Sequence, residues 1–238
     1  MKKLKYLVTG TGRSGTVYMS RFLTSVGIMC GHESIFTPQG INEASMRLTH
    51  VNNIKTSKVS LIENDNWFDH NLQIAESSYM SCPFLQHDIL KDTKIIHVIR
   101  NPLKVISSTF IDAKFLDDNN KGQKRYSDFV YQFLPNLKNI VNRLERVTCY
   151  YILWNEMVKK NSINKNYYLH KIEDGINKNI FDFLEIEPKN NFYDNKKSNC
   201  WYKREKDLNI DDLPSIDLEY KIYNIMKTYE YKIKKKYI

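Results

Sequence analysis

Apolar and polar residues along this chain follow two different repeats, which together predict alternating strands and helices. Nearly continuous apolar runs predict buried strands at residues 5–9, 28–30, 94–99 and 167–171. A helical repeat predicts helices at about 102–115, 136–160 and 175–185, an earlier helix that ends at Gly27, and a last helix from Leu218 to Tyr229. Strands that alternate with helices are typical of an α/β protein with a central parallel β-sheet flanked by helices.

Three segments carry no clear repeat. Residues 40–90 mix polar and apolar positions without a period, and residues 117–125 and 188–214 are polar, which predicts loops. The chain has 238 residues, of which 42% are hydrophobic, and this is enough to build one sizeable core. We therefore expect a single domain over residues 1–238.

The composition narrows the class of protein. The chain carries 36 Lys and Arg against 27 Asp and Glu, a formal net charge of +9, which favours an anionic partner such as a nucleotide. It has no apolar stretch of the roughly 18 to 20 residues that cross a membrane. Its four cysteines are too far apart for a metal site or a disulfide framework. We expect a cytoplasmic protein with no metal ion and no stable membrane insertion.

A glycine-rich segment at residues 10–16, Gly-Thr-Gly-Arg-Ser-Gly-Thr, lies between the first predicted strand and the first predicted helix. A loop of this kind presents backbone N–H groups at a helix N-terminus, where an anion binds. A Walker A loop is disfavoured, because Thr16 and Val17 stand where that motif has Lys and Ser or Thr. The glycines also satisfy the dinucleotide-binding pattern G-x-G-x-x-G, with Glu33 as its acidic residue.

A second polar cluster follows the predicted strand at 94–99. Arg100 ends that strand, Asn101 is a predicted helix cap, and Pro102 suits the first helical position. On the helix that follows, Lys104 and Ser108 share one face, opposite the apolar stripe. A basic residue and a hydroxyl on that face, together with Arg100, predict a site for a second phosphate.

These two clusters resemble the nucleotide-binding motifs of the PAPS-dependent sulfotransferases, where PAPS is 3′-phosphoadenosine-5′-phosphosulfate. The run Arg13-Ser14-Gly15-Thr16 resembles the 5′-phosphosulfate loop [KR]-S-G-T-[TS], with Val17 in place of the last hydroxyl residue. The segment from Arg100 to Ser108 resembles the 3′-phosphate element R-[ND]-P-x-x-x-x-x-S. The resemblance extends to bacterial sulfotransferase-like proteins and implies a P-loop NTPase-like three-layer fold.

The resemblance also implies a role for each candidate residue. Arg13 would neutralise the charge that grows on the leaving group, and no metal is needed. The nucleotide would be bound by Gly12, Arg13, Ser14, Gly15, Thr16 and Val17 on its 5′ side, by Arg100, Lys104 and Ser108 on its 3′ side, and by Trp201 and Lys203 from a loop that closes over it.

The general base has two candidates in neighbouring positions. Carbohydrate and tyrosylprotein sulfotransferases place a catalytic glutamate about 20 residues after the cation of the loop, and Glu33 follows Arg13 by 20 residues. Small-molecule sulfotransferases use a histidine instead, which makes His32 the alternative. We predict Glu33 as the base.

The resemblance implies a sulfotransferase that moves a sulfuryl group from PAPS to an acceptor hydroxyl, leaving 3′,5′-adenosine bisphosphate (PAP). The predicted acceptor is a glycan or a small metabolite, and no nucleic-acid partner is expected. Two alternatives stay open at this point, an NADP-dependent Rossmann oxidoreductase and a non-catalytic nucleotide-binding protein. The oligomeric state is not predicted.

Overall fold

The structure is a computed structural model that describes residues 4–49, 73–188 and 208–232. The chain divides into two compact units. The sheet unit comprises residues 1–10, 15–99 and 157–199, and the helical unit comprises residues 11–14, 100–156 and 200–238. Each unit is described by itself. The single domain expected over residues 1–238 stays a prediction.

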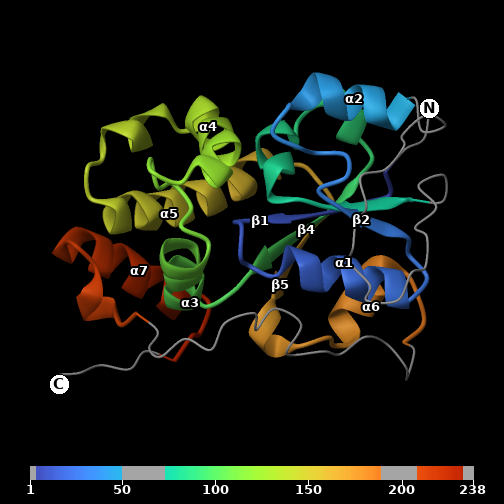
Figure 1. Ribbon diagram of the computed structural model, residues 1–238. Coiled ribbons are helices and arrows are strands. Elements are labelled where there is room, and N and C mark those ends of the chain that lie inside the picture. Colours follow the sequence, from blue (N-terminus) through green and yellow to red (C-terminus); the bar gives the residue numbers. More distant parts are fainter. Residues whose placement is uncertain (1–3, 50–72, 189–207, 233–238) are drawn as a thin grey trace. The chain divides into compact units, whose positions relative to one another are not determined.

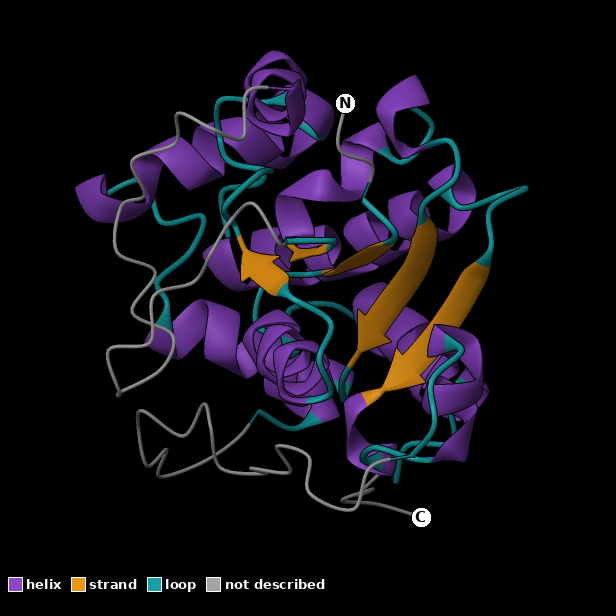
Figure 2. Cartoon of the chain, turned by 90° about the vertical axis from the view of Figure 1, so that its right-hand side faces the viewer, coloured by secondary structure: helices purple, strands orange, loops and turns teal. Residues whose placement is uncertain are grey.

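The described part of the sheet unit contains five parallel strands. They are β1 (Tyr6–Gly10), β2 (Cys30–His32), β3 (Ala75–Ser77), β4 (Lys94–Ile99) and β5 (Tyr167–Lys171). Their order across the sheet is β2-β3-β1-β4-β5, and every neighbouring pair is parallel. Figure 2 shows these strands in orange among the helices. In a parallel sheet all carboxyl ends lie at one edge, so the residues that follow β1 and β2 leave the sheet on the same side.

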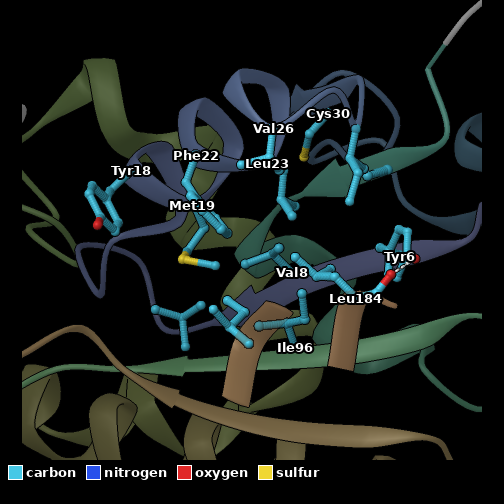
Figure 3. Close-up of a cluster of buried hydrophobic side chains, with 14 of the residues drawn as sticks. Tyr6, Val8, Tyr18, Met19, Phe22, Leu23, Val26, Cys30, Ile96 and Leu184 are labelled. Atoms are coloured by element: carbon cyan, nitrogen blue, oxygen red, sulfur yellow. Dashed lines mark hydrogen bonds between the residues drawn. The ribbon is translucent and has the colours of Figure 1, made fainter. Parts of the chain in front are cut away.

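Helices cover both faces of the sheet, which confirms the predicted three-layer α/β fold. In Figure 1, α1 (Thr16–Ser25) and α6 (Lys178–Leu184) lie on one face, and α2 (Ile41–Thr49) lies on the other. The core between the sheet and the first two of these helices is built from side chains that β1, α1 and α6 bury together, as Figure 3 shows; its largest members include Tyr6, Met19, Phe22, Leu23 and Leu184. The hydroxyl of Tyr6 donates a hydrogen bond of 2.6 Å to the carbonyl of Leu184.

The helical unit contains α3 (Pro102–Ser107), α4 (Lys124–Phe133), α7 (Ile216–Thr228) and α5 (Arg143–Asn161), whose last residues belong to the sheet unit. A π-helical turn over Ser108–Asp112 continues α3. Buried aromatic rings form much of this unit's core. Tyr150 packs against Phe115 and Trp154 with ring centroids 5.4 Å apart in each pair, and Trp154 also contacts Phe129.

Several element boundaries differ from the predictions, and three of these differences have a clear local reason. Strand β3 lies inside segment 40–90, where no element was predicted. The sequence did not indicate this strand, because it is short and its central residue is the buried Glu76. Helix α4 begins at the end of the predicted loop 117–125. The long helix predicted at 136–160 begins at Arg143, because a 3-10 turn at Pro135–Asn139 precedes it.

Within the described part of the chain, no helix is long and apolar enough to span a membrane. The described cysteines Cys30, Cys82 and Cys149 form no disulfide with one another. No group of three or more metal-ligating His, Cys, Asp or Glu side chains occurs among the described residues.

Candidate active site

The glycine-rich loop joins β1 to α1, as predicted, and Gly15 is a constrained position at the start of α1. Gly15 has a φ of 110°, a conformation that residues with a side chain rarely adopt. A Cβ at this position would lie 2.8 Å from the terminal carbon of Ile172, which follows β5. The positive φ, together with this close contact, favours glycine at residue 15.

The N-terminus of α1 is suited to bind an anion. Gly15 is the N-cap residue, so no side chain caps the helix, and its first turn contains no acidic residue. The first N–H groups of a helix have no partner within it, and the helix dipole favours negative charge there. The side chains of Thr16 and Val17 begin this helix, with Thr16 buried. These features fit the expected binding of a phosphate or phosphosulfate group.

The middle of the loop, residues 11–14, belongs to the helical unit and is held by hydrogen bonds within it. The N–H of Ser14 donates to the carbonyl of Thr11, and the hydroxyls of these two residues are also hydrogen-bonded. The N–H of Gly12 donates to the hydroxyl of Tyr150 on α5, at 3.2 Å. Arg13 is exposed and has a φ of 70°, which few residues other than glycine adopt.

A chain of hydrogen bonds joins Arg13 to the second predicted phosphate element. Nε of Arg13 donates to Oγ of Ser108 at 2.9 Å, although the two residues are 95 positions apart in the sequence. The Ser108 hydroxyl in turn donates to a carboxylate oxygen of Asp112 at 3.0 Å. Ser108 is 1% exposed, whereas Lys104 is exposed. The structure thus brings Ser108 and Arg13 together, and it gives Lys104 and Ser108 different surroundings.

Arg100 lies at the end of β4, as predicted, and is half-buried. Its carbonyl accepts a hydrogen bond from the hydroxyl of Tyr151 at 3.3 Å, which fixes the backbone there. Asn101 caps α3 by accepting from the N–H of Lys104, and Pro102 occupies the first turn. Among the described residues, the Arg100 guanidinium makes no ion pair.

His32 and Glu33 lie in the sheet unit, at the carboxyl end of β2. Nε2 of His32 is 3.3 Å from the hydroxyl of Thr16, the first residue of α1. Oε1 of Glu33 lies 4.0 Å from the same nitrogen, and the two side chains are 15% (His32) and 26% (Glu33) exposed. Glu33 has a φ of 51°, and its N–H donates to the carbonyl of Ser77. Both candidate bases are therefore close to the N-terminus of α1.

Burial changes the chemistry of His32, one of the two candidate bases. It lowers the pKa of His32 to about 4, and the positive charge of Arg21 acts in the same direction. His32 is then neutral at pH 7 and binds a proton weakly. A neutral imidazole whose Nε2 contacts the Thr16 hydroxyl is suited to orient the N-terminus of α1.

We expect the free energy of unfolding to decrease when the pH is lowered from about 7 to about 5. The pKa values of His32 and His170 are both lowered to about 4 in the folded chain, mainly by burial, against about 6.5 in an unfolded chain. Between these values the unfolded chain binds more protons, so acid favours unfolding. Urea unfolding should show that His170→Phe loses less stability over this range than wild type, by about 1 to 2 kcal/mol.

The control for this measurement is His87→Gln, because His87 is exposed. In this variant the free energy of unfolding should depend on pH as it does in wild type. If the free energy of unfolding of His170→Phe depends on pH as that of wild type does, then His170 is not held neutral by the fold.

The sequence analysis missed two residues at these positions, Tyr150 and Asp112. Tyr150 belongs to the helical repeat of α5, so only its contact with Gly12 distinguishes it. Asp112 follows Ser108 by four residues, the spacing of neighbouring side chains on a helix, so this contact could have been predicted from the helix expected at 102–115. The other two predicted cofactor-binding residues, Trp201 and Lys203, lie outside the described residues.

Comparison with known proteins assigns the chain to a family. The sequence profile of the sulfotransferase domain matches residues 3–215, which is most of the chain. The chain belongs to this family, and its members are enzymes that take a sulfuryl group from PAPS. A crystal structure of a sulfotransferase from Alicyclobacillus acidocaldarius resembles it with a TM-score of 0.48 and 10% identity, over 98% of both chains. Among the curated proteins, none has a significantly similar sequence.

Proposed function

We propose that this chain transfers the sulfuryl group of PAPS to a hydroxyl of a glycan or a small metabolite, and that residues 12–17, Arg100 and Ser108 bind the donor. The observation that carries the site assignment is the hydrogen bond from Arg13 to Ser108. It joins the two sequence elements that resemble the 5′-phosphosulfate loop and the 3′-phosphate element. Membership of the sulfotransferase family favours this function over the NADP-dependent alternative.

The donor-side residues divide by the anionic group that they bind. Gly15 and the first N–H groups of α1, with the hydroxyl of Thr16, bind the 5′-phosphate side. Arg100 and Ser108 bind the 3′-phosphate, a task for a guanidinium and a hydroxyl. Arg13 neutralises the negative charge that develops on the bridging oxygen when its bond to sulfur breaks.

Glu33 acts on the acceptor side. As the acceptor oxygen forms its bond to sulfur, the carboxylate of Glu33 takes the proton of the acceptor hydroxyl. The bond between sulfur and the bridging oxygen breaks at the same time, and PAP leaves with both electrons. His32 orients Thr16 through the contact between Nε2 and the hydroxyl. No metal ion is required for these steps.

The class of acceptor and the cytoplasmic location are proposed from sequence context. The motifs resemble those of bacterial sulfotransferase-like proteins, and the composition is rich in lysine, asparagine and isoleucine. Both features favour a bacterial or phage enzyme, for which sugars and small hydroxyl compounds are more common acceptors than secreted protein tyrosines. The Lys196–Arg204 segment, proposed to close over the nucleotide, lies outside the described residues.

Calorimetric titration with PAP tests the donor site without an acceptor. Wild type should bind PAP with micromolar affinity, and Arg100→Ala should weaken binding by at least about 1.5 kcal/mol, or about tenfold, because a hydrogen bond to a charged group is lost. The matched control is Arg125→Ala, which removes an exposed arginine of α4. Binding of NADP in place of PAP, or PAP affinity that Arg100→Ala leaves unchanged, would refute the proposed donor site.

A further inference from the structure

We infer that Glu76 is a positioning residue, which holds residues 33–35 in the conformation that fixes the direction of the Glu33 side chain. The inference rests on the proposed role of Glu33 as the general base. Glu76 is the central residue of β3, and β3 pairs with β2, the strand that leads into Glu33. Its side chain is 0% exposed, so it acts through other residues and not on a substrate.

The carboxylate of Glu76 accepts four hydrogen bonds, three of which come from the segment after Glu33. Oε1 accepts from the N–H of Ser34 at 2.8 Å and from the N–H of Ile35 at 2.9 Å. Oε2 accepts from the hydroxyl of Ser34 at 2.7 Å and from Nε2 of Gln73 at 2.8 Å. A carboxylate is costly to bury, and this complete set of donors offsets that cost.

The same segment is held from its other side by α2. Arg47 donates from its guanidinium to the carbonyl of Ser34 at 2.6 Å, and it also forms an ion pair with Glu43 one turn earlier. Together, Glu76 and Arg47 bind the N–H, the hydroxyl and the carbonyl of Ser34. The residue directly after Glu33 therefore has very little freedom to rotate.

Gly31 allows the carboxylate to come this close to the segment. A Cβ at residue 31 would lie 2.6 Å from Oε2 of Glu76 and would also meet Gln73 and Ser34. No residue with a side chain fits at that position while the four hydrogen bonds remain. The absence of a side chain at Gly31 thus makes room for the hydrogen bonds of Glu76.

This arrangement matters for Glu33 because its backbone is in the left-handed region, with a φ of 51°. A residue other than glycine keeps such a conformation only when its surroundings impose it. On one side the N–H of Glu33 is bonded to Ser77, and on the other side Glu76 holds the N–H groups of Ser34 and Ile35. Without Glu76 the backbone at Glu33 would relax, and its carboxylate would lose its fixed direction.

The test compares Glu76→Ala with Glu76→Gln. Glutamine keeps one oxygen that accepts from both backbone N–H groups, whereas alanine removes every acceptor. We measure PAP formation from PAPS with a panel of mono- and disaccharides, and PAP affinity by calorimetry. Glu76→Ala should lower kcat about 100-fold, as expected for a misplaced catalytic group. The KM for PAPS and the affinity for PAP should stay within about twofold, and Glu76→Gln should keep kcat within about fivefold.

Tyr6→Phe is the control for a lost buried hydrogen bond in the same unit, because it removes the bond to Leu184. It should lower the melting temperature and leave kcat unchanged. If Glu76→Ala behaves as Tyr6→Phe does, the role of Glu76 is structural only and the inference is wrong. A loss of activity in Glu76→Gln as large as that in Glu76→Ala would also overturn it, since hydrogen-bond acceptance would then not explain the effect.

Amide hydrogen exchange provides a second readout that does not depend on turnover, and exchange of the β1 amides in the same variant reports any general loss of stability. Ser34→Ala removes one of the four hydrogen bonds, and Glu76→Ala removes them all. The amides of Ser34 and Ile35 should exchange slightly faster in the first variant and much faster in the second. Wild-type exchange in both would overturn the inference. Glu33→Gln, assayed in parallel, separates the two hypotheses: if it keeps full activity, the proposed base is wrong.

Discussion

Glu33→Gln is expected to lower kcat by about 10² to 10⁴-fold, the range that a positioned general base contributes. The substitution keeps the size of the side chain and removes its ability to take a proton. Because Glu33 is proposed to act on the acceptor and not on the nucleotide, the affinity for PAP should stay within about twofold of wild type. Turnover should be measured as PAP formation from PAPS with the best acceptor of the saccharide panel.

Two further variants test whether the loss of kcat is specific to Glu33. Glu156→Gln removes an exposed carboxylate of α5 and should have wild-type kcat. His32→Gln should lower kcat less than Glu33→Gln does, because His32 is proposed to orient Thr16 and not to take the proton of the acceptor. A larger loss in His32→Gln than in Glu33→Gln would reverse the assignment of the base.

Arg13→Ala is expected to lower kcat by about 10² to 10³-fold, as the loss of a charged group at a developing negative charge does. The guanidinium of Arg13 is held by Ser108, so it does not need to be ordered during the reaction. Binding of PAP should weaken much less than kcat, because the charge on the bridging oxygen grows as the bond to sulfur breaks.

Arg13→Lys tests whether the positive charge itself is needed. The related loop motif has either Lys or Arg at this position, so this variant should retain more activity than Arg13→Ala. Arg125→Ala, which removes an exposed arginine that stacks on Tyr126, should leave kcat unchanged. Equal losses of kcat and of PAP affinity in Arg13→Ala would show that Arg13 only binds the nucleotide.

Much of the fold could be predicted from the sequence, because its strands are apolar and its glycines are concentrated near the N-terminus. The strands β4 and β5 occur with the predicted bounds, and β1 is displaced by one residue. Strand β3 could not be predicted, since a three-residue strand with a buried glutamate has neither the length nor the pattern of a strand. Its hydrogen bonds to Ser34 and Ile35, far away in the sequence, stabilise the glutamate there.

In the candidate site, too, some features could be predicted from the sequence and others could not. The motif residues Arg13, Arg100 and Ser108 could be found from their spacing in the sequence. Each belongs to a short motif that resembles one of the sulfotransferase family and that lies at the end of a strand or the start of a helix. The bond between Arg13 and Ser108 could not, since it depends on how residues 95 positions apart approach each other. Single-residue conformations such as the left-handed backbone at Glu33 are likewise set by tertiary contacts rather than by local preference.

The π-helical turn after α3 has a consequence for aligning this sequence with others. The N–H of Ala113 bonds to the carbonyl of Ser108, five residues earlier, so this turn holds one residue more than an α-helical turn would. The spacing from Arg100 to Ser108 precedes the extra residue and is unaffected. A homologue with a regular α-helix at this place should therefore align without a gap up to Ser108. Directly after Ser108 it should show a one-residue deletion, and its serine hydroxyl should have a different hydrogen-bond partner.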